Sequence, residues 1–415
     1  MVYYTKYIRE VWQIKKVLFI IPTLGNGGAE KSFISLLENL NFNKYEVDVF
    51  AIRPTGLVAD MLPDYVNLIS LPQDVVDFKD SIKKSSLKFL KKGKINVFLN
   101  RIMFSYTLVK YQKTNEAEQR AFRYYKGVFK NYFSHYDVAV SYLEKTTNYL
   151  VSEIIDADIK IGYYHSDYNK LNLNSDLEKK LVENLDYLVT ISDNCADILK
   201  EALPEYADKV RVIENIISRK SLLRQAKKEY PFKDGFKGIR IVTAGRISHE
   251  KGPDIAVETG RILREKGYNI KWHLVGKVDD ETAVTLAGKY GLSENFIFEG
   301  LLVNPYKFMY NCDIYVQPSR FEGKSIAIEE AKALGVPVVT SAFTTAFSQI
   351  EQNKTGLVAE AISPEAIAEK IEVLIKDKIL YEQIKHNLES YKSNEDEVLK
   401  LEKIFDKEDD FGETN

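Results

Sequence analysis

Apolar runs alternate with amphipathic stretches along most of the chain, and this alternation predicts its secondary structure. The first run, VLFIIP (17–22), precedes the glycine-rich segment TLGNGG and then AEKSFISLLENL. In the latter, Phe33, Leu36, Leu37 and Leu40 recur at helical spacing, so the order is strand, turn and helix. Further strands are predicted at YEVDVFAI, YDVAVSY, KIGYYH, YLVTIS and VRVIEN.

The same pattern begins again after a polar linker at 227–237. Strands are predicted at IRIVTAG, KWHLVG, FIFEG, DIYVQP and VPVVTS, and PDIAVETGRILREKG begins a helix with Pro253 in its first turn. Apolar strands that alternate with helices form parallel sheets covered on both faces. We therefore predict an α/β fold of two Rossmann-like, doubly wound domains facing across a cleft. They comprise residues 1–220 and 235–385, and a C-terminal helix and acidic tail (386–415) follow.

Composition places the chain among soluble globular proteins, with 415 residues, 45% of them hydrophobic and 28% charged. Cys195 and Cys312 lie far apart in the sequence and fit no disulfide framework or metal-ligand spacing, which is typical of a cytoplasmic protein. The run VLFIIP is too short to cross a bilayer and begins too late for a signal peptide.

Positive charge is concentrated in one segment although the formal net charge is only −2. Residues 79–130 contain 14 Lys or Arg against three acids, Asp80, Glu116 and Glu118, and many aromatic residues are interleaved with them. This pattern suits an anionic surface, either membrane headgroups or a nucleic acid. It suits equally well a helical insertion at about 75–132 whose lysines are simply solvated.

The stretch SRFEGKSIAIEEAKALGVPVV places Glu322 in a loop and Glu330 in the helix that follows. Ser325 is a suitable cap for this helix, and free backbone N–H groups at its start, next to the small Gly323, favour an anion. Each carboxylate could accept hydrogen bonds from a vicinal diol. Spacing alone is also compatible with Glu330 as an exposed helix residue.

Two cations lie at the end of another predicted strand of the same domain. Arg246 and Lys251 in IVTAGRISHEKGPD flank a strand end and a helix start, where a phosphate would fit. Two acids and two cations at strand ends would be costly without a partner. Together they predict a nucleotide diphosphate sugar as ligand.

These motifs resemble those of glycosyltransferase family 4, whose retaining enzymes have the GT-B fold. The resemblance rests on GGAEKS, GRISHEKGPD, LVG and FEG, and above all on EGKSIAIEEAKALGVPVV, which is similar to the family's E-x7-E signature. It implies that Glu330 holds the donor ribose and that Glu322 lies near the donor sugar. It also implies that Arg246 and Lys251 bind the diphosphate.

By the same resemblance, the backbone N–H groups of Gly323, Lys324 and Ser325 at this helix start contact the donor. Gly27 and Gly28 correspond to a glycine loop of the first domain that approaches the donor. His165 in IGYYHSDYN matches a histidine that related enzymes direct at the cleft, although a structural histidine at a strand end is the alternative. Tyr164 and Asp167 are the implied acceptor-side residues, and Ile216 replaces the glycine expected after Asn215.

The implied reaction is hexosyl transfer with retention from a nucleotide diphosphate sugar, with UDP favoured, to a hydroxyl of a glycan or polyprenyl-linked acceptor. Such chemistry serves bacterial surface polysaccharide synthesis and implies no cofactor or metal. The D-x-D segment from Asp156 to Asp158, which could indicate a metal-dependent transferase of another fold, lies in a predicted turn rather than after a strand. We expect a cytoplasmic protein that binds no nucleic acid and whose basic insertion docks on the inner face of the cell membrane.

Three alternatives remain at this point. A nucleotide-sugar 2-epimerase has a similar architecture and binds the same donor without an acceptor. A nicotinamide-dependent dehydrogenase is disfavoured because neither LGNGGAEKS nor GRISHEKG supplies G-x-G-x-x-G. A nucleic-acid-binding module is supported only by the basic segment.

Overall fold

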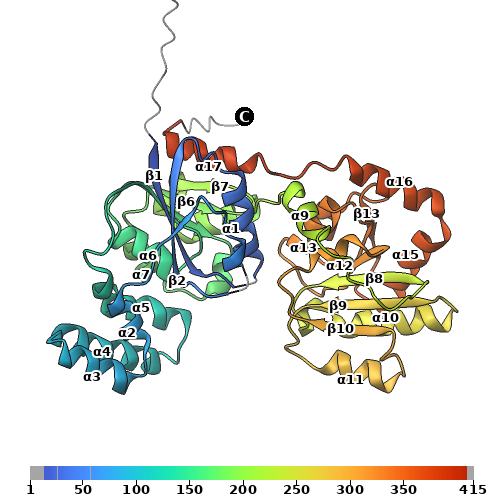
Figure 1. Cartoon of the computed structure of the whole chain (residues 1–415), viewed down its shortest axis with the longest axis horizontal. Coiled ribbons are helices and arrows are strands. Elements are labelled where there is room, and N and C mark those ends of the chain that lie inside the picture. The colour runs from blue at the N-terminus through green and yellow to red at the C-terminus, as the bar shows by residue number, and fades with distance from the viewer. Residues whose placement is uncertain (1–13, 26, 57, 409–415) are drawn as a thin grey trace, which may run out of the picture. The chain divides into compact units, whose positions relative to one another are not determined.

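Two parallel β-sheets organise the chain, one in each of two units (Figure 1). The computed structural model describes residues 14–25, 27–56 and 58–408. One unit comprises Met1–Ile216 with Asp396–Asn415, and the other comprises Ile217–Glu395. Asn26 of the glycine-rich turn and residues 409–415 of the acidic tail lie outside the described residues.

The sheet of the first unit has the strand order β3-β2-β1-β4-β5-β6-β7, and every pair is parallel. Its strands are β1 (Lys15–Thr23), β2 (Tyr45–Arg53), β3 (Asn67–Leu68), β4 (Tyr136–Ser141), β5 (Ala157–Tyr164), β6 (Tyr187–Thr190) and β7 (Val210–Val212). Side chains alternate between the faces, so that Phe19 of β1 joins one core and Leu18 the other. Helices cover both faces; besides the inserted ones they are α1 (Gly28–Asn39), α6 (Thr146–Glu153), α7 (Ser175–Leu181), α8 (Asp193–Ala202) and α17 (Glu397–Asp406).

The second unit repeats this plan with the strand order β10-β9-β8-β11-β12-β13. Its strands are β8 (Ile239–Ala244), β9 (Ile270–Val275), β10 (Phe296–Gly300), β11 (Ile314–Gln317), β12 (Val338–Thr340) and β13 (Gly356–Val358). Cores on both faces are closed by α9 (Arg219–Ala226), α10 (Pro253–Glu265), α11 (Thr282–Lys289), α12 (Tyr306–Tyr310), α13 (Ile326–Ala333), α14 (Ala346–Gln349), α15 (Pro364–Lys376) and α16 (Lys378–Glu389).

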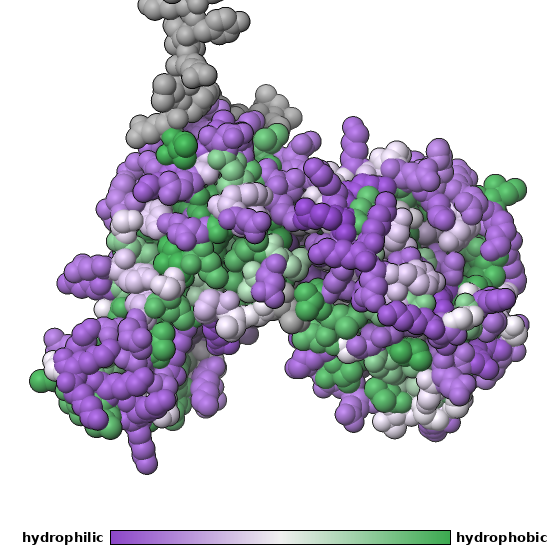
Figure 2. All heavy atoms as spheres, viewed as in Figure 1, coloured by the Kyte–Doolittle hydropathy of each residue, from purple (hydrophilic) through white to green (hydrophobic). Residues whose placement is uncertain are grey.

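The basic segment forms helices inserted between β3 and β4, namely α2 (Gln73–Lys79), α3 (Ile82–Lys91), α4 (Ile95–Lys110) and α5 (Asn115–Tyr125). Its aromatic residues mostly pack inward rather than towards solvent: Phe89 and Phe122 are buried and Phe104 is partly buried in the same core. The exposed apolar positions are mainly aliphatic, with Tyr106 as an aromatic exception. Figure 2 shows hydrophobic side chains at the margin of this helical layer, whose surface towards the viewer is mainly hydrophilic.

The structure contains two strands that the hydrophobic pattern did not predict, β3 and β13. Both span only two or three residues, and the two residues of β3 are exposed at the sheet edge, so no alternation of apolar and polar residues marks them. Of the part of the chain that the structure describes, no helix combines the length and the apolar character needed to cross a bilayer.

The last helix, α17, belongs to the core of the first unit rather than to a separate tail. Phe405 is fully buried, and its ring centroid lies 6.3 Å from that of Phe19 and 5.3 Å from that of Tyr45. The Asp406 carboxylate accepts hydrogen bonds from Lys15 at 2.9 Å and from the Tyr45 hydroxyl at 3.0 Å. The chain therefore returns to the first unit after it completes the second.

Replacing Phe405 by Ala is expected to destabilise the first unit by about 3–5 kcal/mol, because it removes a buried ring and leaves a cavity. The matched control Leu399→Ala lies in the same helix, where Leu399 is 50% exposed, and is expected to change stability by less than about 0.5 kcal/mol. Differential scanning calorimetry measures both shifts. Equal melting temperatures for the two variants would contradict the placement of α17 in this core.

Candidate functional site

The carboxyl edge of the second sheet changes direction between β8 and β11. These strands are neighbours, but the chain continues from β8 to β9 on one side and reaches β11 only after β10. Ligands of doubly wound sheets bind at this kind of switch point, outside the carboxyl ends of the strands. The loops that follow β8 and β11 carry most of the residues predicted to bind the donor.

These two loops approach each other closely, which explains the second glycine of GRISHEKG, Gly252. Gly252 has a φ of +65°, and a Cβ built on it would lie 2.1 Å from the carbonyl oxygen of Pro318. Arg320 also joins the loops, because its guanidinium donates to both carboxylate oxygens of Asp254, at 2.8 and 2.6 Å. Backbone contact and a bidentate ion pair therefore hold the edge in one geometry.

Glu322 is buried, with 7% of its surface exposed, and its carboxylate is bound from several sides. Lys251 Nζ lies 2.7 Å from each carboxylate oxygen. Oε1 also accepts hydrogen bonds from Gln317 Nε2 at 3.0 Å and from Ser319 Oγ at 2.8 Å. The structure thus brings together two predicted site residues, Glu322 and Lys251, as an ion pair at the end of β11.

Glu330 is also buried rather than exposed on its helix, with 5% of its surface accessible. It lies in α13, and its Oε1 accepts a hydrogen bond from the hydroxyl of Tyr306 in α12 at 2.9 Å. The alternative of a solvated helix residue is therefore wrong. Its neighbour Glu329 has a different set of contacts, including an ion pair with Lys332 at 2.8 Å.

Arg246 differs from Lys251 in having no carboxylate partner. Its side chain is exposed after the end of β8, and it makes no ion pair with any described residue. Lys251 is committed to Glu322, yet an ammonium has three N–H donors, so it can still contact a further oxygen. Arg246 therefore presents a positive charge that faces outward at this edge.

The start of α13 is only partly available to an anion. The backbone N–H of Ser325 donates to Gln349 Oε1 at 2.8 Å, which differs from the expectation that it serves a ligand. Gln349 returns a bond from Nε2 to the carbonyl oxygen of Ser325 at 3.0 Å. Gly323 and Lys324, by contrast, are exposed.

Gly27 and Gly28 belong to the first unit, where Gly28 begins α1 and Gly27 caps it. Both are exposed. A Cβ on Gly27 would lie 2.3 Å from Oε2 of Glu30, so a larger residue here would require the Glu30 carboxylate to move. Burial raises the pKa of Glu30, against the effect of hydrogen bonds from the Glu30 and Gly27 backbone.

His165 follows β5, in an aromatic setting. Its ring lies 4.8 Å from that of Tyr142 and is stacked against that of Tyr163, with centroids 5.4 Å apart. Its backbone N–H donates to Glu144 Oε2 at 2.9 Å. Burial lowers the pKa of His165, and the negative charge of Glu144 opposes this effect only in part, so the imidazole is neutral at neutral pH.

Tyr164 lies in the core and not on an acceptor-facing surface. It is 1% exposed, and its hydroxyl donates to Glu178 Oε1 at 2.6 Å. Tyr149 and Gln119 also donate to this buried carboxylate, at 2.6 and 2.7 Å. Asp167 is partly exposed, and its side chain accepts from the backbone N–H of Asn169 at 3.0 Å.

Asp156 and Asp158 lie at the start of β5 and contact the exposed ring of His135 at 3.1 and 3.6 Å. Within the described ranges, no group of three or more His, Cys, Asp or Glu residues is arranged to hold a metal ion. At the linker, Ile216 is buried and has no positive φ, so the turn there does not need glycine.

Sequence reasoning missed four residues that position this site, which are the partners Gln317 and Ser319 of Glu322, the partner Tyr306 of Glu330, and Gln349 at the start of α13. Gln317 and Ser319 could have been found, because both are polar and follow directly on the apolar positions of β11. Tyr306 and Gln349 gave no local signal, since each reaches the site from a separate helix.

Residues 226–391 match the family described as glycosyl transferases group 1, and this range contains Arg246, Lys251, Glu322 and Glu330. The capsular polysaccharide biosynthesis glycosyltransferase CapM of Staphylococcus aureus is 34% identical over 145 residues. That match covers 34% of this chain, and the chain spans only 38% of CapM.

A longer match is with a Campylobacter jejuni protein named N-acetylgalactosamine-N,N'-diacetylbacillosaminyl-diphospho-undecaprenol 4-alpha-N-acetylgalactosaminyltransferase. It is 23% identical over 380 residues, which cover 90% of this chain and 93% of that protein.

Solved structures share the architecture of this chain. TarM of S. aureus has a TM-score of 0.63 at 14% identity, and the match covers 95% of this chain and 99% of TarM. HepE of Anabaena in complex with UDP-glucose has a TM-score of 0.61 at 15% identity, with the same coverage of 95% and 99%. The predicted pair of parallel-sheet α/β domains of the GT-B type is confirmed.

The lowered pKa of His165 predicts a stability that falls as the solution becomes acidic. Below about pH 6.5 the unfolded chain takes up a proton that the native state resists, at up to about 1.4 kcal/mol per pH unit for one group. His165→Gln is therefore expected to lose less melting temperature than the wild type between pH 7.5 and 5.5.

The control for this experiment is His386→Gln, because the His386 side chain is 84% exposed. This variant is expected to follow the wild type at both pH values. If His165→Gln did the same, the neutral buried imidazole would be contradicted.

Proposed function

We propose that this chain, whose residues 226–391 belong to the glycosyl transferases group 1 family, is a retaining glycosyltransferase of family 4. It transfers a sugar from a nucleotide diphosphate sugar, with a UDP-sugar favoured, to a hydroxyl of a glycan or lipid-linked acceptor. The observation that carries this proposal is the buried Glu322 held by Lys251 beside the exposed Arg246, at the carboxyl edge of the second sheet.

Arg246 and Lys251 bind the donor diphosphate in this proposal. Arg246 offers an exposed guanidinium suited to bidentate contact with phosphate oxygens. Lys251 offers its remaining N–H while it stays bound to Glu322. As the bond between the anomeric carbon and the phosphate oxygen breaks, both cations stabilise the charge on the leaving group.

The two glutamates fix the hydroxyl groups of the donor. Glu330 is oriented by Tyr306, and a carboxylate can accept further hydrogen bonds, so it suits the ribose diol. Glu322 is held by Gln317, Ser319 and Lys251, and suits the transferred sugar. Their partners keep both side chains in place before the donor binds, which lowers the cost of ordering them.

The configuration at the anomeric carbon is retained because the acceptor attacks the same face from which the diphosphate departs. The acceptor oxygen bonds to the anomeric carbon while the departing phosphate takes the acceptor proton, so the chain supplies position and charge. No cofactor or metal is required, because Arg246 and Lys251 carry the charge stabilisation. In the first unit, the neutral His165 and the partly exposed Asp167 are the candidate acceptor-side residues.

The names of the relatives support a place in bacterial surface polysaccharide synthesis. CapM is named for capsular polysaccharide biosynthesis, and WclY of Escherichia coli, 30% identical over 161 residues, for O-antigen biosynthesis. HepE was solved with UDP and with UDP-glucose, which supports a UDP-sugar as the donor of this chain.

Replacing Arg246 by Gln is expected to weaken UDP-sugar binding about tenfold or more, because it removes a hydrogen-bonded charge worth about 1.5–3 kcal/mol. Arg261→Gln is the matched control, since Arg261 lies on α10 in contact with Glu258 and Glu265. A thermal-shift panel of UDP-, GDP-, ADP- and dTDP-sugars gives both affinity and donor base. Unchanged binding of every donor by Arg246→Gln would overturn the donor site.

We also propose that α3 and α4 dock the first unit on an anionic membrane surface. Ile95, Leu99, Ile102, Tyr106 and Val109 form a stripe along α4, and they are between 38% and 69% exposed. Their spacing of three and four residues puts them on one side of the helix. A peripheral position of this kind would bring a lipid-linked acceptor close to the enzyme.

Lysines beside this stripe supply the charge that favours acidic headgroups. Lys83 and Lys91 of α3 are exposed and make no ion pair with a described residue. Lys88 and Lys92 are less suited, because both are bound to the Asp77 carboxylate at 2.6 Å. Burial of the Asp77 carboxyl raises its pKa, but the hydrogen bonds from Lys88 and Lys92 outweigh burial and hold the pKa well below its usual value.

The variant Leu99→Ser/Val109→Ser is expected to lower sedimentation with phosphatidylglycerol vesicles several-fold, since each buried apolar side chain contributes about 1.5–3 kcal/mol. Lys83→Glu/Lys91→Glu is expected to do the same at low salt and less at high salt. Ile379→Ser is the control, because Ile379 is 84% exposed in the second unit. Equal sedimentation of all variants would exclude this surface as the membrane contact.

A further inference from the structure

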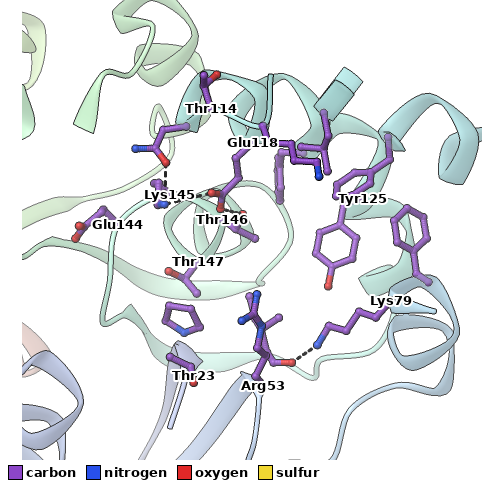
Figure 3. A pocket seen from close by; sticks show the side chains of 18 of the residues that line it. Thr23, Arg53, Lys79, Thr114, Glu118, Tyr125, Glu144, Lys145, Thr146 and Thr147 are labelled. Atoms are coloured by element: carbon purple, nitrogen blue, oxygen red, sulfur yellow. Dashed lines mark hydrogen bonds and ion pairs between the residues drawn. The ribbon is translucent and has the colours of Figure 1, made fainter. Parts of the chain in front are cut away.

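A cavity of about 770 Å³ lies in the first unit, beyond the carboxyl ends of β1 and β2 (Figure 3). Thr23 ends β1 and Arg53 ends β2, while Glu144 of the loop after β4 and Thr147 of α6 close another side. The inserted helices α2, α4 and α5 supply the remaining wall. The order β2-β1-β4 makes this the switch point of the first sheet, the place where doubly wound sheets bind ligands.

Among the cations that line this cavity, Arg53, Lys79 and Arg101 come from three different elements, and none of these three forms an ion pair with a carboxylate of the described residues. Arg53 of β2 is exposed and makes no ion pair with a described residue. Lys79 of α2 donates to the backbone carbonyl oxygen of Ile52. Figure 3 shows the Arg53 and Lys79 side chains extending towards the same space, where the Tyr125 ring also ends.

Arg101 of α4 is the third cation, and it is 8% exposed. Its guanidinium donates to the backbone oxygen of Asp80 at 3.0 Å and to the Ser105 hydroxyl, while its buried Nε has no partner among the described residues. The guanidinium carbon lies 5.2 Å from the ring centroid of Phe78. A buried charge with an unused donor is costly unless a ligand satisfies it.

The acids that line the cavity have other partners and form no ion pair with these three cations. Glu118 pairs with Lys145 at 3.3 Å. Glu144 accepts from the His165 backbone N–H at 2.9 Å and from the Ser166 hydroxyl at 2.7 Å. The positive charge at the Arg53 end of the cavity is therefore uncompensated.

The nearby charge of Arg53 affects the pKa of Lys79. Burial lowers the pKa of Lys79 to about 8, and the charge of Arg53 contributes to this. A bound anion would oppose both effects and raise the pKa of Lys79, because its negative charge favours the ammonium and offsets the charge of Arg53.

We propose that this cavity binds a phosphoryl group of the acceptor substrate, with Arg53, Lys79 and Arg101 as its ligands. The inference rests on the proposed glycosyltransferase function and names the chemical class of its acceptor. Phosphate oxygens point in several directions and can accept from three separate elements, whereas the two oxygens of a carboxylate lie in one plane. The phosphoryl group is held and not transferred.

One side of α4 lines the cavity and the other side carries the exposed apolar stripe, and this arrangement suits a phosphoryl group that is attached to a lipid. Arg101, Phe104 and Leu108 line the cavity at spacings of three and four residues. Leu99 and Val109, on the proposed membrane-facing side, are 52% and 69% exposed. One helix thus connects the cationic cavity with the exposed apolar stripe, so a membrane-anchored phosphate could reach Arg101 without leaving the surface.

The test uses the full chain with saturating UDP, so that the second unit's diphosphate site is occupied, and inorganic pyrophosphate as the probe in calorimetric titration. Wild type is expected to bind the probe, and Arg53→Gln/Lys79→Gln to bind it at least tenfold more weakly. Lys180→Gln/Lys200→Gln removes two exposed charges from the same unit and is expected to match the wild type.

Equal pyrophosphate affinity of the wild type and the Arg53→Gln/Lys79→Gln variant would overturn the inference, as would absence of binding to the wild type. The single variant Arg53→Gln serves if the double variant does not fold, since Arg53 makes no side-chain bond to another described residue. UDP binding is measured first, because it distinguishes failure of the proposed function from failure of the acceptor site. Its absence defeats the UDP-dependent transfer on which this inference rests, while its presence with unchanged pyrophosphate binding defeats only the acceptor site.

Competition identifies the source of the phosphoryl group. Displacement of pyrophosphate by a polyprenyl phosphate in detergent micelles supports a lipid-linked acceptor, and displacement by glucose 6-phosphate alone supports a soluble one. Displacement by glucuronate but by neither phosphate would overturn the assignment of a phosphoryl group. In the first two cases the acceptor KM is expected to rise at least tenfold in Arg53→Gln/Lys79→Gln while the donor KM stays unchanged.

Discussion

The reversal of strand order beside the first strand of each sheet is the constraint on which both binding regions depend. β1 lies between β2 and β4, and β8 lies between β9 and β11. Right-handed crossovers carry the chain to opposite faces on the two sides of such a strand, so no crossover helix covers its carboxyl end. Side chains placed there remain open to a ligand although the sheet itself is buried.

Charge at these open edges is stabilised in two different ways. In the second unit, Glu322 is buried but fully bonded, because Lys251, Gln317 and Ser319 surround its carboxylate. In the first unit, Arg101 is buried with its Nε unpartnered. The first arrangement holds a side chain ready before a ligand arrives, and the second has a polar atom that a ligand can satisfy.

The helical insertion gives the first unit features that its sheet does not have. Its lysines are not uniformly solvated, since Lys88 and Lys92 stabilise the nearly buried Asp77 and thereby fix α3 against α2. Its aromatic rings close the core over the sheet. The rings of Phe78 and Phe104, for example, pack edge to face with their centroids 5.3 Å apart. The same helices therefore cover the sheet, wall the cavity and expose an apolar stripe.

The sequence by itself determined the two α/β repeats and the location of the acids and cations of the second unit. Period-two and period-3.6 patterns are local, so β8, β11 and α13 could be predicted together with the loops that carry Arg246, Lys251 and Glu322. The strands β3 and β13 could not be predicted, because β3 consists of two exposed residues and β13 is a three-residue strand that begins at a glycine, whereas the equally short β12 lies in the longer apolar run VPVVTS.

Only the tertiary structure decided which of these side chains contact each other. The ion pair of Lys251 with Glu322, the bond of Tyr306 to Glu330 and the burial of Tyr164 on Glu178 join residues from separate elements. The cavity around Arg53, Lys79 and Arg101 likewise combines β2, α2 and α4. Such contacts depend on how the elements pack against one another, and the pattern of a single segment contains no information about that packing.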